Sequence, residues 1–149
     1  METWELIARE QVRDAYAIYT HSGDRFRLED LAGCFTEDGL LEVKGRKEAH
    51  GQAEIVGMLS GGSTQVKPST SADSGSKTFI RHFIANIRFD LTSPERIETS
   101  AYFQVLTGSG LDHWGRYRDV FVPSEGRWLI QHRLVAVDES VTGSWLSSR

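Results

Sequence analysis

The sequence predicts an α+β domain in which N-terminal helices cover one face of a curved, mixed or antiparallel sheet. Apolar residues recur at three- and four-residue spacing over residues 4–20, which is typical of an amphipathic helix. Turn-forming Gly, Pro and Ser residues later separate four strand-like runs, which span residues 78–90, 97–107, 114–122 and 127–137. A length of 149 residues fits one domain, expected over residues 1–149.

Shorter elements are predicted between the first helix and these strands. Residues 21–23 are expected to break the first helix, which places Asp24 at a joint. The elements expected after this joint are a helix over 28–35, a turn over 36–39, a strand over 40–43, a polar connection over 45–51 and a helix over 52–59. The order of helices first and strands last is that of an α+β domain.

Residues 60–77 are rich in serine, threonine and glycine and nearly free of apolar side chains. Such a segment cannot bury enough apolar surface to fold by itself, so we expect a mobile loop. Long loops in compact domains often cover active sites, and a lid over a pocket is one interpretation. A surface insertion without function is the other.

Composition and charge exclude several classes of function. The hydrophobic fraction is 39%, the charged fraction 26% and the formal net charge −4. Nucleic acids and anionic membranes require a basic face, so neither is an expected partner. The N-terminus has neither the basic region nor the apolar core of a signal peptide, and no apolar run approaches the about 18 residues of a membrane span. We therefore expect a cytoplasmic protein.

No metal or cofactor is expected either. Cys34 is the only cysteine, which rules out an intrachain disulfide and a thiolate cluster. The five histidines lie on separate predicted elements and form no HxH or HxxxH pair, so a metal site is not predicted. The sequence also has no glycine-rich phosphate loop, no GxSxG and no CxxC.

His82 is the most informative single residue, because it lies in a run, TFIRHFIANIRF, that is apolar on both faces. A buried imidazole without a partner costs about 1–3 kcal/mol, so a polar group from another element should reach it. Asp24 is the best candidate. A histidine held by a carboxylate can act as a general base, although a hydrogen-bonded core histidine is the simpler alternative.

Several segments, in order along almost the whole chain, carry a family resemblance: FTEDGLLEV, RHFIANIRF, SAYFQV, GRYRDVFV and GRWLIQHRLVAVD. The sequence resembles the SnoaL-like branch of the nuclear transport factor 2-like superfamily, which includes scytalone dehydratase, bile acid dehydratase and lindane dehydrochlorinase. The resemblance implies a cone-shaped fold whose bent sheet and helices enclose an apolar pocket.

The resemblance also implies roles for individual residues. Dehydratase members pair an Asp after the first helix with a His on the strand after the third, often followed four residues later by Asn. Those places hold Asp24, His82 and Asn86 here, and Tyr19 stands where several dehydratases carry a Tyr. By this resemblance His82 abstracts a proton, Asp24 orients the His82 ring, and Tyr19 is a third catalytic residue.

Strand alternation suggests which other side chains share the cavity with His82. The candidates for substrate binding are Asn86, Tyr102, Tyr117 and His132. The two tyrosines are equally explained as core residues. Asp119 and Arg133 are expected to pair with each other or with neighbouring arginines in a solvated charge ladder across strands.

Together these features predict a cofactor-independent lyase or isomerase that removes a proton from a small hydrophobic cyclic or aromatic substrate and expels a leaving group. A polyketide-cyclase-like enzyme and a non-catalytic binding protein are the alternatives.

The strand over 78–90 is apolar on its second face too, where Phe79, Phe83 and Phe89 lie. Because the helices cover only one side of the sheet, we expect a homodimer or homotrimer.

Overall fold

The computed structural model describes residues 1–61 and 79–148. Its helices are α1 (Thr3–Asp24), α2 (Leu28–Ala32), α3 (Gln52–Ser60) and a short 3-10 helix, η1 (Trp145–Ser148). Its strands are β1 (Phe35–Val43), β2 (Lys47–His50), β3 (Ile80–Thr92), β4 (Ile97–Thr107), β5 (Gly110–Ser124) and β6 (Arg127–Ser140). Residues 62–78, which include nearly all of the predicted loop over 60–77, lie outside the described residues.

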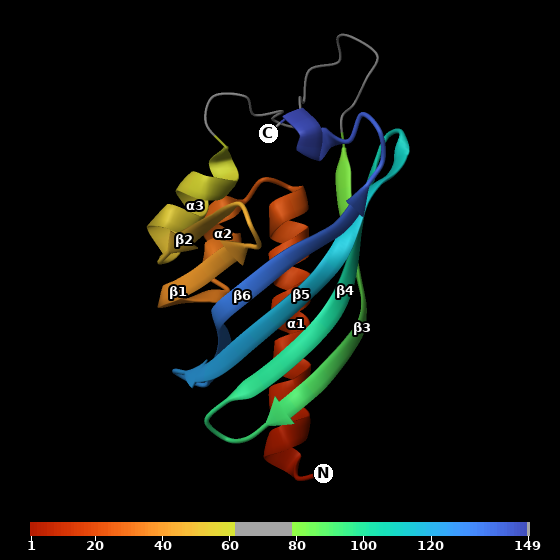
Figure 1. Cartoon of the computed structure of the whole chain (residues 1–149). Helices are drawn as coiled ribbons and strands as arrows, with labels where there is room; N and C mark the ends of the chain where they lie inside the picture. The colour runs from red at the N-terminus through yellow and green to blue at the C-terminus, as the bar shows by residue number, and fades with distance from the viewer. Residues whose placement is uncertain (62–78, 149) are drawn as a thin grey trace.

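The strands form one curved, mixed sheet in the order β2-β1-β6-β5-β4-β3. Only the β1–β6 pair of this sheet is parallel among the described strands. Figure 1 shows α1 running along one face of the sheet, with α2 and α3 beside β1 and β2. The predicted α+β class, with N-terminal helices on a curved sheet, is confirmed.

Helix α1 is longer than predicted, because residues 21–23 continue it to Asp24. Its buried stripe includes Ala8, Val12, Tyr16 and Tyr19, the three- and four-residue spacing expected of a helix that packs on a sheet. The sequence His-Ser-Gly at residues 21–23 predicts a helix break, which the structure does not show. Packing of this stripe outweighs the weak helix propensity of those three residues, because tertiary contacts commonly override propensity.

Three predicted boundaries around β1 were wrong. The second helix ends at Ala32, the predicted turn lies inside β1, and β2 occupies most of the predicted polar connection. The turn signal marks an irregularity, since the parallel register of β1 with β6 shifts between Phe35 and Leu40. A Cβ on Gly39 would lie only 2.9 Å from the Phe35 Cβ, so only glycine fits this bend.

A bulge in β6 decides which of its side chains face the core. Ile130 pairs with Phe121 and His132 with Val120, which leaves Gln131 without an opposite residue. The extra residue reverses the alternation, so Ile130 and Arg133 are both buried on the same side. The predicted solvated charge ladder was therefore wrong: Arg133 and Asp119 form an ion pair with side chains 0% exposed.

Candidate functional site

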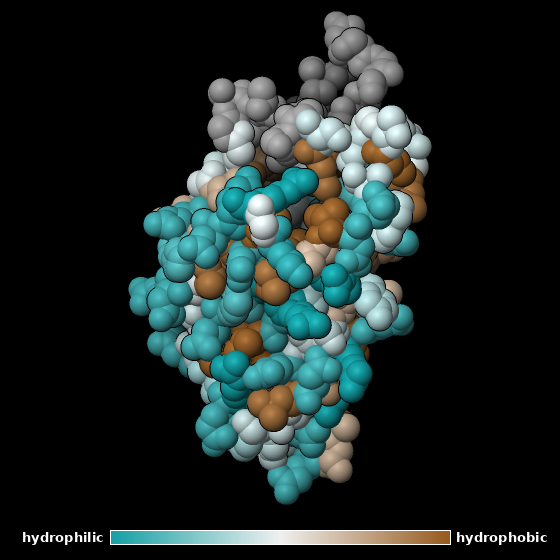
Figure 2. Space-filling view, in the orientation of Figure 1, coloured by the Kyte–Doolittle hydropathy of each residue, from teal (hydrophilic) through white to brown (hydrophobic). Residues whose placement is uncertain are grey.

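A cavity of about 1110 Å³ lies between α1, α2, the β1–β2 hairpin and the curved sheet. Its apolar lining includes Leu31, Leu41, Met58, Phe103 and Val135. Figure 2 shows a hollow in the upper part of the molecule with both brown and teal side chains along its border. A concave, mainly apolar site with a few polar groups is the usual form of a small-molecule site.

Asp24 and His82 meet at the wall of this cavity, although 58 residues separate them in the chain. The Nδ1 atom of His82 lies 2.6 Å from Oδ1 of Asp24, and the backbone N–H of His82 donates to Oδ2 at 3.0 Å. The His82 side chain is 22% exposed, and the Asp24 side chain is 8% exposed. Because Nδ1 is bonded to the carboxylate, Nε2 is the ring nitrogen available to a ligand.

The end of α1 positions Asp24. Arg27 N–H donates to the Ser22 carbonyl at 2.8 Å and Phe26 N–H to the Gly23 carbonyl at 3.1 Å, the two bonds of a Schellman motif. Phe26 occupies the left-handed position with φ of 59°, where glycine is usual. A bulky residue there is strained, and here its side chain lines the cavity.

A second histidine–carboxylate pair, which the sequence reasoning missed, lies beside the same cavity, and its histidine, His113, is one of the lining residues. His113 Nδ1 lies 2.7 Å from Oδ2 of Asp112, and both side chains are only 6% exposed. Asp112 also accepts hydrogen bonds from Ser144 Oγ at 2.7 Å and from Trp145 N–H at 3.0 Å. The His113 ring is stacked with Trp145, so this pair connects β5 to η1.

Burial shifts the titration of this second pair. Burial is the main cause that lowers the pKa of His113 from 6.5, and it outweighs the opposing effect of Asp112. Positive charge on His82 also lowers the pKa of His113, because the two rings are close enough for their charges to interact. For Asp112, burial alone would raise the pKa, but the hydrogen bonds from Trp145, Ser144 and His113 lower it overall. The pair is therefore a neutral imidazole beside a firmly ionised carboxylate.

Tyr19 and Tyr117 also line the cavity. Burial raises the pKa of Tyr19, and it raises the pKa of Tyr117 well above 10.0. Both phenols therefore stay protonated and can donate hydrogen bonds. The guanidinium carbon of Arg133 lies 4.2 Å from the Tyr19 ring centre and 4.3 Å from that of Tyr117. This cation–π packing holds the two rings in place from the core side.

Arg133 belongs to a buried polar network next to the cavity. Its Nε and Nη2 atoms each donate to Asp119 at 2.8 Å, and Asp119 also accepts from Tyr16. Tyr16 further contacts Thr99 Oγ1 at 2.9 Å. A buried ion pair with these additional hydrogen bonds is costly to break, since removal of one partner leaves the other charged and desolvated. The sequence signal that could have found it is the inward parity of Tyr117, Asp119 and Phe121 on β5.

Three predicted binding residues lie outside the cavity. Tyr102 is 56% exposed because His82 is paired with Val105, which puts the odd-numbered residues of β4 on the cavity side. Asn86 is exposed with φ of 55°, at a bulge between Ala85 and Arg88. His132 bonds Glu42 at 2.9 Å on the opposite face of β6, beyond the bulge at Gln131. The expected inward orientation of these three is corrected.

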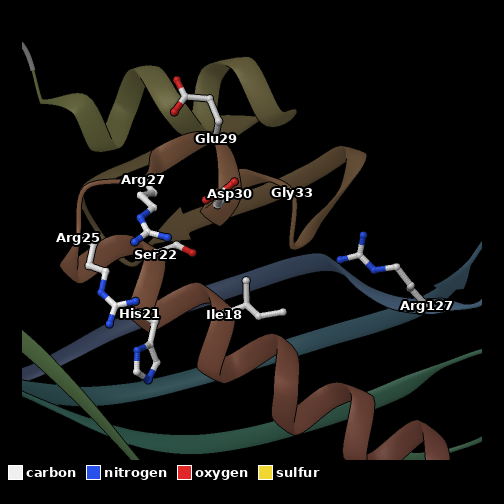
Figure 3. A pocket seen from close by; sticks show the side chains of 9 residues that line it. All are labelled: Ile18, His21, Ser22, Arg25, Arg27, Glu29, Asp30, Gly33 and Arg127. Carbon is white, nitrogen blue, oxygen red and sulfur yellow. The ribbon is translucent and has the colours of Figure 1, made fainter.

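A separate polar groove of about 480 Å³ lies outside the α1–α2 joint. Figure 3 shows that Arg25 and Arg27 come from this joint, whereas Arg127 comes from the start of β6. Glu29 and Asp30 line the same groove. Its mixed charges and exposed side chains form no convergent set, so the groove is no candidate for catalysis.

Other kinds of site find no support in the described residues. No three His, Cys, Asp or Glu side chains within 1–61 and 79–148 are grouped to hold a metal ion. Burial raises the pKa of the Cys34 thiol to about 11, so this cysteine stays protonated at neutral pH. No helix in the described part of the chain is long and apolar enough to cross a membrane.

A family model described as a SnoaL-like domain matches residues 4–134. A solved structure from Catenulispora acidiphila, in complex with S-DNPA, is 26% identical, with a TM-score of 0.72 over 87% of this chain and 92% of that chain. A protein assigned as a scytalone dehydratase from Novosphingobium aromaticivorans is 18% identical, with a TM-score of 0.75 over 91% and 87% of the two chains. The comparison with curated proteins finds no match.

A nuclear transport factor 2-like protein with a cystatin-like fold, also from Novosphingobium aromaticivorans, is 21% identical, with a TM-score of 0.73 over 97% and 90% of the two chains. At such identities the likeness of these solved structures concerns the fold. The match of the family model, in contrast, spans most of the sequence. The chain therefore belongs to the SnoaL-like domain family.

Proposed function

We propose that this protein is a cofactor-independent lyase or isomerase of the dehydratase type, which acts on a small hydrophobic cyclic or aromatic substrate. The observation that carries the proposal is the 2.6 Å contact between Asp24 and His82 Nδ1 at the wall of an apolar cavity. The carboxylate fixes the tautomer that leaves the Nε2 lone pair free, and it stabilises the imidazolium formed after proton transfer.

In the proposed elimination, His82 Nε2 accepts a proton from the carbon next to an activating carbonyl group. The electrons of the broken C–H bond move onto the carbonyl oxygen as an enolate, and they then form the new C=C bond as the C–O bond to the leaving hydroxyl breaks. The imidazolium returns its proton to the leaving oxygen, which departs as water. General-base catalysis of this kind contributes about 10²–10⁴ in rate, and positioning supplies much of the remainder.

Negative charge develops on the substrate carbonyl during this step, and protonated donors in the cavity would stabilise it. Tyr19 and Tyr117 are suitable because burial raises their pKa values. His113 cannot donate to this charge, because its neutral ring donates from Nδ1 to Asp112 and its Nε2 is left to accept a hydrogen bond from a ligand hydroxyl or a bound water. We assign Tyr19 and Tyr117 to substrate positioning and His113 to the polar end of the site.

The test is turnover of cyclic β-hydroxy ketones, followed by absorbance of the conjugated product and by deuterium uptake at the carbon next to the carbonyl in D₂O. We expect His82→Gln to lower both by at least about 10²-fold. His132→Gln, on the opposite face of the sheet, is the matched control and should keep the wild-type rate. Retention of more than about a tenth of the rate in His82→Gln would place the base elsewhere.

Two alternatives give different results in this assay. A polyketide-cyclase-like enzyme, which the family also supports, would lead with an acid and lose activity as the pH rises through the pKa of that acid. A non-catalytic binding protein would bind the same ketones with neither product nor deuterium uptake. Its affinity would also be unchanged in His82→Gln.

The expected homodimer or homotrimer stays a proposal. Phe83 and Tyr102 are 51% and 56% exposed on the face of the sheet that points away from the cavity. Contact with a second copy would remove this apolar surface from water. Light scattering should therefore show an oligomer for the wild type and a shift toward monomer for Tyr102→Arg. A monomeric wild-type protein at micromolar concentration would contradict the proposal.

A further inference from the structure

Basic side chains gather around the apolar cavity, although the chain as a whole carries a net charge of −4. The arginine and lysine residues that line the cavity come from three segments: the α1–α2 joint, the β1–β2 hairpin and the start of β3. They are Arg25, Arg27, Arg46, Lys47 and Arg81. All are exposed, as expected of side chains at a mouth rather than in an interior. The cavity thus joins an apolar interior to a cationic rim.

Within the described residues, the cavity itself offers little negative charge to offset these cations, although Glu29 and Asp30 line the neighbouring groove with Arg25 and Arg27. Among the described lining residues, Asp24 is the only carboxylate, and both of its oxygens are bonded to His82. None of the basic rim side chains forms an ion pair within the described residues. Elsewhere most arginines do have carboxylate partners, as in Arg9 with Glu5 or Arg116 with Asp138.

The rim charges act close to the proposed reaction centre. Arg25 directly follows Asp24, and Arg81 directly precedes His82. After burial, which is the main cause, the positive charge of Arg46 is among the effects that lower the pKa of His113 inside the cavity. An anionic group held at the mouth would therefore lie within electrostatic reach of both histidines.

We infer that the rim binds a carboxylate carried by the substrate, so that the ligand is an aromatic or alicyclic acid with its ring in the apolar interior. This inference rests on the proposed function, because it assigns a substrate class to the same cavity. A carboxylate fits better than a phosphate, since the cations are separate side chains and the sequence has no glycine-rich loop to supply a cradle of backbone N–H groups. Each exposed charge alone contributes at most about fivefold in affinity.

The test compares two probes that differ only in charge, naphthoate and naphthamide, by calorimetric titration at low salt. We expect the wild type to bind naphthoate at least about fivefold more tightly. Raising the ionic strength from about 0.01 M to about 1 M should remove this preference, because the Debye length falls from about 30 Å to about 3 Å. Binding of naphthamide should change little with salt.

Charge-removing variants locate the effect. The doubles Arg25→Gln with Arg27→Gln, and Arg46→Gln with Lys47→Gln, should each reduce the preference for naphthoate by several-fold and leave naphthamide binding within about twofold. Arg118→Gln, an exposed arginine on β5, is the matched control and should keep the preference. Equal binding of both probes by the wild type, or a preference that survives both doubles, overturns the anionic subsite. If both probes bind equally well, the anionic subsite is wrong, but the apolar cavity of the proposed function is still supported. If neither probe binds, both proposals fail.

Discussion

The two histidine–carboxylate pairs at the cavity are built in opposite ways, and Asp112 is the one of their four residues that does not line it. Asp24 and His82 come from α1 and β3, 58 residues apart, and the His82 side chain is 22% exposed. Asp112 and His113 are neighbours on β5, and both are almost completely buried. The first pair meets only because the whole domain folds. The second needs only a local irregularity in one strand, together with η1 packed on it.

This difference separates two tasks. Within the described part of the chain both Asp24 oxygens bond His82, so this carboxylate can respond to a charge on that ring. Asp112 instead divides its hydrogen bonds among His113, Ser144 and Trp145, which ties the C-terminal η1 to the sheet. We expect the first pair to control the rate and the second to control stability and the shape of the cavity.

The largest effect should be on rate, and it should distinguish the pairs. His82→Gln is expected to lower kcat/KM by at least about 10²-fold, which is about 2.7 kcal/mol, with little loss of stability. His113→Gln should lower it less, because this ring is not the base. Steady-state kinetics and urea unfolding of both variants measure the two quantities. A larger loss of kcat/KM in His113→Gln would reverse the assignment.

The next effect is on stability. Asp112→Ala leaves Ser144 and the Trp145 N–H without their buried acceptor, so the free energy of unfolding should fall by about 1–3 kcal/mol. Asp24→Asn keeps a hydrogen-bonding group of the same shape in place and should cost less stability. Urea titrations of the two variants in parallel test this order, and equal losses would show that Asp112 is no special anchor.

Stability should also depend on pH through the second pair. The folded state lowers the pKa of His113 below 6.5, so it favours the neutral ring, and the unfolded chain binds more protons. This contribution is complete above pH 6.5 and is lost as the pH falls from 6.5 through the folded pKa. The lowered pKa of Asp112 adds a second loss below 3.8. Unfolding of His113→Gln should lack the first loss; an unchanged pH profile in that variant would contradict this account.

The smallest effect concerns the strained joint that carries Asp24. Phe26→Gly and Phe26→Ala lose the same aromatic packing, but only glycine relieves the left-handed backbone at φ of 59°. A glycine variant usually has a lower free energy of unfolding than an alanine variant. Here the free energy of unfolding of Phe26→Gly should exceed that of Phe26→Ala by about 1 kcal/mol. Urea unfolding measures the difference, and an alanine variant that equals or exceeds the glycine variant would show that the joint relaxes.

Periodicity alone predicted the helical stripe of α1 and the four C-terminal strands, because both patterns are local properties of a chain with one buried face. The contact between Asp24 and His82 could be anticipated for a related reason: an isolated polar ring in an apolar strand needs a partner. For the other predicted site residues, the direction of each side chain was inferred from strand alternation. That inference fails wherever a β-bulge adds a residue to one strand. Asn86 and Gln131 each lie at a bulge, which the sequence does not announce.

The sequence by itself determined the α+β class, the SnoaL-like resemblance and the identity of the proposed base, since these follow from hydrophobic pattern and from a residue that is out of place in it. Only the tertiary structure decided the second pair. Adjacent strand residues normally point to opposite faces, so Asp112 and His113 looked unrelated. Asp112 is the extra residue between the pairs Val105–His113 and Leu106–Leu111, and this bulge lets both side chains be buried. Register is set by packing across the whole sheet, which is why no local pattern could reveal it.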